Sequence, residues 1–134
     1  MSAIKISNLQ YVWPESNTPI IDIPALEVEL RGSVFLQGAS GSGKSTLLSL
    51  LAGTLKASSG TLQILGTDLT SLSSRRRDRF RAEHIGIVFQ QFNLIPFLTV
   101  EGNLKLASRF VNQSVSGTEV RAKKLLESLR LDSA

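Results

Sequence analysis

GASGSGKST, at residues 38–46, is the stretch that decides the fold of this 134-residue chain. It contains the pattern G-x-x-x-x-G-K-[ST], in which Gly38, Gly43, Lys44 and Ser45 hold the fixed positions. Glycine lets the backbone curl tightly, so that several N–H groups can point at one anion. A helix that starts directly after the loop adds the positive end of its dipole at the same place. The stretch therefore predicts a loop that binds phosphate groups.

The residues on either side of the loop agree with this interpretation. Residues 33–37, SVFLQ, predict a short buried strand that ends at the loop, and residues 45–52, STLLSLLA, predict a helix with Gly53 at its C-terminal end. The alternative is a glycine- and serine-rich turn that carries a lysine by chance, and such a turn would not be expected to lie between a buried strand and a helix. In the loop, the Lys44 ammonium is expected at the β- and γ-phosphates and the Ser45 hydroxyl at Mg²⁺. The predicted nucleotide-binding residues are Gly38, Ala39, Ser40, Gly41, Ser42, Gly43, Lys44, Ser45 and Thr46.

Composition limits the class of protein. The chain is 42% hydrophobic and 19% charged, which is typical of one globular domain with a real core. It has no cysteine, which excludes disulfides and cysteine-bound metals. It opens without a signal-peptide pattern, and no apolar stretch is long enough to span a bilayer. We expect a soluble chain that reaches any membrane through a partner.

The net charge of +4 comes from one place, residues 75–81. Five arginines there are offset only by Asp78: Arg75, Arg76, Arg77, Arg79 and Arg81. Such a run can bind nucleic acid or anionic lipid. Because Phe80 is the only aromatic residue among the arginines, the solvated face of a helix over residues 73–83 is the favoured interpretation, and no nucleic-acid partner is expected.

The remaining patterns predict a β layer followed by helices. Residues 3–7, 26–30 and 60–66 predict strands of an antiparallel layer, with a turn-rich connection between Tyr11 and Pro24. Residues 84–89 are apolar and β-branched, as in a buried strand of a parallel sheet. Thr99 is expected to cap a helix whose apolar residues are Val100, Leu104, Ala107 and Val111. A polar loop at 112–117 and a second helix carrying Ala122, Leu125, Leu126 and Leu129 follow.

Several separated features together resemble the nucleotide-binding subunit of an ATP-binding-cassette (ABC) transporter. They are the loop at 38–46, the aromatic Tyr11, and the segment 86–90, GIVFQ, which looks like the Q-loop entry of that family. Gln90 follows Lys44 by 46 residues, a spacing typical of the family. The sequence of residues 92–99, FNLIPFLT, is similar to the corresponding segment in the lipoprotein-releasing and macrolide-export branch of the family. The phosphate loop alone occurs in many nucleotidases, whereas the combination is specific.

The resemblance implies an α/β fold: a P-loop NTPase core of the ABC type, a flanking antiparallel β layer and the beginning of a helical subdomain. Residues 1–90 would form the core and β layer, and residues 91–134 the Q-loop exit and the start of the helical subdomain. The resemblance covers only about the first half of the family's domain, so a truncated domain is expected. The central strands of the parallel sheet would lie in the other half, which predicts exposed apolar surface at residues 47–51 and 85–89.

The same resemblance implies roles for single residues. Tyr11 would stack on adenine, with Trp13 as the alternative ring. Gln90 would be a catalytic and metal-contacting residue that reaches Mg²⁺ or the attacking water and reports the γ-phosphate to the transport partner; Gln91 is the alternative register. The signature Leu-Ser-Gly-Gly-Gln, the acidic strand with its catalytic Glu and the switch His are not in the sequence, and His84 precedes the Q-loop and cannot replace that His. We therefore expect weak nucleotide binding and little or no hydrolysis from this chain alone.

The implied cofactors are ATP and Mg²⁺, and the implied partners are a membrane permease and a second ATP-binding subunit arranged head to tail. The apolar loop at 90–98, with Phe92, Ile95 and Phe97, would contribute to the permease-docking surface unless these side chains pack in a core. The expected location is cytoplasmic and peripheral to the membrane. The alternative function is a small P-loop kinase for a metabolite, although such kinases usually place the phosphate loop nearer the N-terminus.

Overall fold

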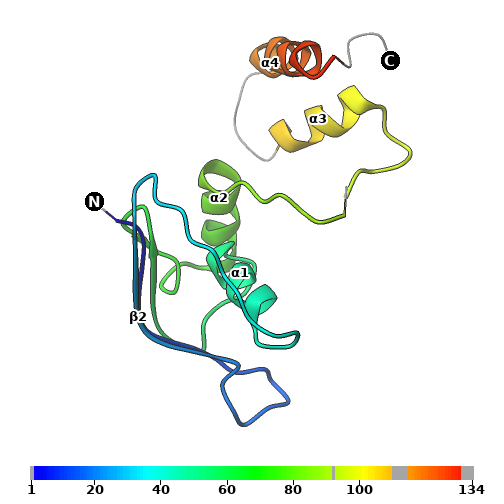
Figure 1. The fold of residues 1–134 in the computed structure, drawn as a ribbon. Coiled ribbons are helices and arrows are strands. Elements are labelled where there is room, and N and C mark those ends of the chain that lie inside the picture. Colours follow the sequence, from blue (N-terminus) through cyan, green and yellow to red (C-terminus); the bar gives the residue numbers. More distant parts are fainter. Residues whose placement is uncertain (1, 92, 110–114, 131–134) are drawn as a thin grey trace. The chain divides into compact units, whose positions relative to one another are not determined.

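The computed structural model describes residues 2–91, 93–109 and 115–130, which form two compact units, residues 1–81 and 82–134 (Figure 1). The predicted division of the chain, with a core up to residue 90 and the start of a helical subdomain after it, stays a prediction. The first unit contains the β layer and the phosphate loop, and the second contains Gln90 and the last two helices.

Four strands of the first unit form one antiparallel sheet, which confirms the predicted antiparallel layer. They are β1 (Ser2–Tyr11), β2 (Ile21–Glu29), β3 (Ser59–Ile64) and the short β4 (Thr67–Asp68), in the order β2-β1-β3-β4. β1 and β2 are longer than the alternating stretches that predicted them, and β4 was not predicted. The predicted connection from Tyr11 to Pro24 is too long, because β2 already begins at Ile21 and Pro24 lies inside this edge strand. An edge strand tolerates proline since one side of its backbone has no strand to pair with.

The core of the first unit lies against one face of this sheet. Ile6, Leu9 and Tyr11 of β1 are buried, as are side chains from β2, β3, the first helix and the turn after β4: Ile21, Leu62, Ile64, Leu47, Leu50 and Leu69. The first helix therefore presents an apolar side to the core.

A local irregularity in β1 fixes the identity of one glycine in β3. The pairing of β1 with β3 shifts register between Ser7 and Gln10, and Asn8 within this interval has a φ of 47°. Gly60 lies against it with a φ of +81°, and a Cβ built at Gly60 would be 2.0 Å from the carbonyl oxygen of Asn8. Glycine is required there by both the dihedral angle and the close approach.

The helices follow the predictions closely. α1 (Lys44–Leu51) and α2 (Ser74–His84) are in the predicted places, and Gly53 takes the expected left-handed conformation after α1, with a φ of +71°. In the second unit α3 (Val100–Arg109) contacts α4 (Val115–Ser128). None of the helices that the structure describes combines the length and the apolarity needed to cross a bilayer.

The predicted cap of α3 is confirmed, because the Thr99 Oγ1 accepts a hydrogen bond of 3.0 Å from the Gly102 N–H. The predicted loop at 112–117 is wrong for residues 115–117, which already belong to α4. Val111 lies outside the described residues. Of the apolar residues predicted for α4, Ala122 is buried whereas Leu125 and Leu129 are exposed.

The two predicted buried strands, the short one before the phosphate loop and the parallel-sheet strand at 84–89, are wrong. Residues 33–37 and 85–89 do not form strands, and no strand among the described residues pairs with either. A strand exists only through hydrogen bonds to a neighbour, so an apolar sequence without a neighbour stays irregular and shows its side chains to solvent. Phe35 is 87% exposed and Val88 is 99% exposed. The exposure expected at 85–89 is confirmed, and in α1 it is confirmed for Leu48, which is 59% exposed, while Leu47 and Leu50 are buried.

Replacing Gly60 with alanine is expected to destabilise the chain by about 3 kcal/mol, because the new methyl would overlap the Asn8 carbonyl and the backbone would be strained. Gly66→Ala is the matched control, since Gly66 has a similar φ of +78° but nothing within 4 Å of the added methyl. The control should lose only about 1 kcal/mol. Chemical denaturation of both variants measures the difference, and equal losses would contradict the argument from close approach.

Acidification is expected to weaken α3 slightly. Lys105 Nζ lies 2.8 Å from Glu101 Oε1 one turn away, and its hydrogen bond and charge hold the pKa of the Glu101 carboxyl below its ordinary value of 4.5. A lowered pKa in the folded state means that this stabilisation is present above the ordinary pKa and is lost as the pH falls through the folded value. The Glu101 side chain is 63% exposed and that of Lys105 36% exposed, so solvent screens the pair and its contribution is small. NMR titration should show the Glu101 pKa rising toward 4.5 in Lys105→Gln, and an unchanged titration would contradict the pairing.

Candidate nucleotide-binding site

The phosphate loop curls through two glycines in the left-handed region. Gly41 has a φ of +79° and Gly43 a φ of +88°, and Gly43 is the N-cap residue directly before α1. The Ser42 N–H donates to the Ala39 carbonyl oxygen across the turn at 3.3 Å. The bend is thus produced by residues that bear no Cβ, as the pattern predicts.

The loop also fits closely against its surroundings. A Cβ at Gly43 would lie 3.0 Å from both the Ile20 carbonyl oxygen and the Ile21 Cδ1, and one at Gly38 would lie 2.7 Å from the Ser42 Oγ. The start of β2 therefore supports the loop at its junction with α1. This contact could not be read from the sequence, because a supporting backbone carbonyl leaves no residue pattern.

Lys44 extends its side chain over the loop rather than into solvent. Its Nζ donates to the carbonyl oxygens of Gly38 at 2.8 Å and Ala39 at 2.5 Å, and it lies 3.4 Å from the Ser42 Oγ. The ammonium is held where the loop curls, and its four-carbon stem allows it to change partners without moving the helix.

The N-terminus of α1 completes a set of anion-binding groups. The Leu47 N–H donates to the Gly43 carbonyl oxygen at 2.8 Å, so the N–H groups of Lys44, Ser45 and Thr46 precede the first intrahelical bond. The first turn contains no acidic residue. Oriented N–H groups, the helix dipole and one ammonium together favour a polyanion at this place. The Ser45 side chain is exposed and can act as an oxygen ligand of a metal ion.

Among the residues that the structure describes, no group of three or more His, Cys, Asp or Glu side chains is placed to hold a metal ion. For Mg²⁺ the predicted ligand in the loop is the Ser45 hydroxyl, at the N-terminal end of α1. Such a site fits Mg²⁺, which commonly binds through substrate phosphates, waters and few protein oxygens.

The two aromatic residues near the end of β1 have different environments. Tyr11 is 8% exposed, whereas Trp13 is 44% exposed. Their ring centroids are 5.0 Å apart at an interplanar angle of 86°, an edge-to-face pair. The Trp13 ring belongs to the connection that ends at Ile20, whose carbonyl oxygen approaches Gly43. Of the two rings, that of Trp13, the alternative to Tyr11, is therefore the more accessible. Adenine stacking by Tyr11 stays a prediction.

Gln90 and Gln91 lie in the second unit, between α2 and α3, and both side chains are exposed. Their predicted roles at Mg²⁺ or at the attacking water stay predictions. Ile95 and Phe97 of the predicted docking loop are described, and Phe97 is 86% exposed; Phe92 lies outside the described residues.

The curled glycine loop, its lysine and the helix that follows define a P-loop nucleotide-binding protein. The family model described as ABC transporter matches residues 23–134, and the chain therefore belongs to the ABC transporter family. This confirms the resemblance seen in the loop, Gln90 and residues 92–99.

Curated relatives agree with this assignment. The chain is 41% identical over 128 residues to an uncharacterized ABC transporter ATP-binding protein of Mycobacterium tuberculosis, an alignment that covers 94% of this chain and 52% of the relative. It is 39% identical over 131 residues to the macrolide export ATP-binding/permease protein MacB of Shigella flexneri, covering 96% of this chain and 20% of MacB. With YbbA, an uncharacterized ABC transporter ATP-binding protein of Escherichia coli, the identity is 42% over 106 residues, or 79% and 46% of the two chains. The chain thus spans about half the length of the mycobacterial relative.

Solved structures show the same fold. A dimeric structure of the bacterial ABC transporter cassette MJ0796 superposes with a TM-score of 0.81 at 32% identity, covering 95% of this chain and 56% of that one. A dimeric post-hydrolysis state of MJ0796 bound to ADP and Pi gives a TM-score of 0.79 at 29% identity, with coverages of 92% and 56%. The predicted fold class, an ABC-type P-loop domain with its antiparallel layer, is confirmed.

Proposed function

We propose that this chain is the nucleotide-binding part of an ABC transporter and binds Mg-ATP at residues 38–46, coupling ATP binding and hydrolysis to the export or release of a substrate through a membrane permease. The observation that carries the proposal is the convergence of the Lys44 ammonium and the first N–H groups of α1 on one loop. The MJ0796 cassette bound to ADP and Pi supports the ligand class, and MacB, a macrolide export ATP-binding/permease protein, supports the export role. The comparisons do not favour a metabolite kinase.

Binding would proceed by an exchange of partners at Lys44. Its ammonium would leave the neutral carbonyls of Gly38 and Ala39 for β- and γ-phosphate oxygens, since hydrogen bonds between two charged groups are stronger. The N–H groups of Ser45 and Thr46 would hold the adjacent phosphate oxygens. The Ser45 hydroxyl would hold Mg²⁺, which, when bound, neutralises part of the phosphate charge.

Trp13 is proposed to cover the adenine base. Its ring is the more exposed of the aromatic pair, and a flat ring buries a purine face at little entropic cost. The buried Tyr11 ring packs against it edge to face. The position of Trp13, in the connection whose end supports the phosphate loop, supports this role.

Gln90 is proposed to contact Mg²⁺ or the attacking water through its amide, with Gln91 as the alternative. Phosphoryl transfer also needs a positioned water and a full shell of charge around the γ-phosphate. The sequence contains no Leu-Ser-Gly-Gly-Gln signature, so a head-to-tail partner and the remainder of a cassette would complete the site. We propose that the chain alone binds nucleotide and turns over little or none.

The turn before α3 is proposed to contact the permease at the cytoplasmic side of the membrane. Leu94 and Phe97 are exposed there. The Asn103 side chain fixes the backbone behind them: its Oδ1 accepts from the Ile95 N–H at 2.8 Å, and its Nδ2 donates to the carbonyl oxygens of Ile95 at 3.2 Å and Thr99 at 3.1 Å. A rigid turn that displays apolar side chains is suited to an apolar partner surface.

Lys44→Ala is expected to weaken Mg-ATP binding about 10- to 100-fold, because one or two charge-assisted hydrogen bonds are lost. Lys56→Ala is the matched control, since Lys56 is an exposed lysine beyond the end of α1. Isothermal titration calorimetry with Mg-ATP separates the two variants. Unchanged affinity in Lys44→Ala would refute the proposed function.

Trp13→Ala is expected to weaken Mg-ATP about tenfold while leaving inorganic tripolyphosphate unaffected, because base stacking contributes about 1–3 kcal/mol. Tyr11→Phe, which keeps the ring, should bind both ligands like the parent. Trp13 is the only tryptophan of the chain, so its fluorescence reports the same event in the parent and in Tyr11→Phe. Equal ATP affinity in Trp13→Ala and the parent would exclude Trp13 as the base-stacking residue.

A further inference from the structure

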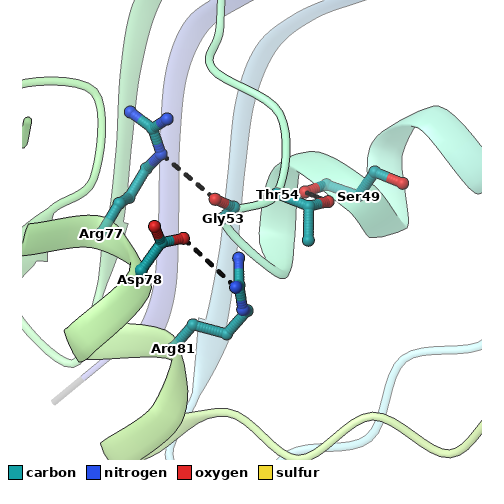
Figure 2. Close-up of polar contacts among 6 residues, drawn as sticks. All are labelled: Ser49, Gly53, Thr54, Arg77, Asp78 and Arg81. Atoms are coloured by element: carbon teal, nitrogen blue, oxygen red, sulfur yellow. Dashed lines mark hydrogen bonds and ion pairs between the residues drawn. The ribbon is translucent and has the colours of Figure 1, made fainter. Parts of the chain in front are cut away.

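The arginines of α2 are not equivalent. Arg75, Arg76 and Arg79 are exposed, and Arg81 pairs with Asp78 on the same helix at 3.2 Å. Arg77 is half-buried and directs its guanidinium to backbone carbonyls outside its own helix (Figure 2). The solvated face predicted for this run therefore does not include Arg77.

Arg77 connects two turns that are distant in sequence. Its Nε donates to the Gly53 carbonyl oxygen at 3.1 Å, and its Nη1 donates to the Leu72 carbonyl oxygen at 3.3 Å. The stem of Arg77 packs on the same glycine, with Cγ 3.6 Å from the position where a Cβ of Gly53 would be. The planar guanidinium can satisfy both carbonyls at once, which a single ammonium does less well.

One of these turns is the C-terminal end of α1. The Ser49 carbonyl oxygen there accepts from the Thr54 N–H at 3.0 Å, the Leu55 N–H at 3.2 Å and the Thr54 Oγ1 at 2.9 Å. α1 has no basic residue in its own last turn. Arg77 supplies a positive charge near this end, where the helix dipole is negative.

The other turn is fixed to the sheet. The Leu69 N–H donates to the Leu62 carbonyl oxygen of β3 at 2.8 Å, and the Asp68 Oδ1 accepts from the Thr70 N–H at 2.9 Å and the Thr70 hydroxyl at 2.6 Å. A continuous set of contacts thus runs from β3 through the turn at 68–72 and Arg77 to the end of α1.

We propose that Arg77 is a positioning residue for nucleotide binding: by fixing the C-terminal end of α1 to the turn on β3, it holds the N–H groups at the other end of α1 in place for phosphate. The inference rests on the proposed function of the loop at 38–46. α1 has eight residues, about 12 Å of helix, and moves as one rod. Its outward side chain Leu48 is exposed, so the helix is held by its apolar side, by the start of β2 next to Gly43 and by this contact at its C-terminal end.

The test compares Arg77→Lys with Arg81→Lys in the 134-residue chain. Both variants keep the charge of α2, but only the first removes the guanidinium that bridges Gly53 and Leu72. Two quantities are measured under conditions where circular dichroism shows both variants folded: the Kd for Mg-ATP, and the hydrogen-exchange rates of the Thr54 and Leu55 amides with and without Mg-ATP. Arg77→Gln, which keeps one donor, replaces Arg77→Lys if the latter does not fold.

We expect Mg-ATP to protect the Thr54 and Leu55 amides in the parent chain. Arg77→Lys should weaken Mg-ATP binding at least about fivefold, speed exchange at both amides and abolish this protection. Arg81→Lys should match the parent in all three. Faster exchange with an unchanged Kd would assign Arg77 a purely structural role and overturn the inference, as would parent-like exchange. A parent chain that does not bind Mg-ATP would overturn the proposed function, and the inference with it.

Discussion

The placement of one ammonium in a loop of main-chain carbonyls is the constraint on which the rest of this structure depends. Lys44 reaches the carbonyl oxygens of Gly38 and Ala39 only because the chain reverses through two left-handed glycines. Gly43 also has to lie against the carbonyl oxygen of Ile20, where a larger residue would collide. The start of β2, the loop and α1 are therefore held in one arrangement. The residue types in the loop follow from this geometry rather than from any need for reactive side chains.

The local part of the fold could be predicted because its causes are local. Turn glycines, the Thr99 cap and the helix that follows the phosphate loop depend on a few neighbouring residues, and the structure has each of them where it was expected. Residues 33–37 and 85–89 could not be assigned correctly in the same way. Their apolar composition is typical of a strand buried between two neighbouring strands. Such a strand forms only when those neighbours are present to pair with it. Without such partners among the described residues, the same composition yields exposed irregular chain.

The two aromatic residues near the end of β1 show how an irregularity in a strand decides which ring is exposed. Ile4 and Ile6 alternate in β1, and continuing that alternation would turn Tyr11 outward and Leu9 with it. The irregularity around Asn8 shifts the alternation by one residue, so that Leu9 and Tyr11 face the core. Trp13 then lies beyond the end of the strand with its ring partly exposed. The apolar spacing of β1 does not mark the shift, and the strand pairing accommodates it only through the close approach of Gly60 in β3 to the Asn8 carbonyl oxygen.

The arginines at 75–81 likewise show a difference between residues that the sequence does not reveal. Five arginines within seven residues look alike in a sequence, and their shared net charge favours solvent for all of them. What distinguishes Arg77 is the carbonyl of Gly53, which becomes available only because the chain leaves α1 through a left-handed glycine. The stem of the arginine lies near the same glycine, with its Cγ 3.6 Å from the position that a Cβ of Gly53 would take. Gly53, which follows α1, and Arg77, which donates to its carbonyl oxygen, thus act together, although they belong to two segments of the sequence that share no motif. Because α1 begins at the phosphate loop, loss of the contact between Arg77 and Gly53 would shift the helix, and with it the N–H groups that are proposed to bind phosphate.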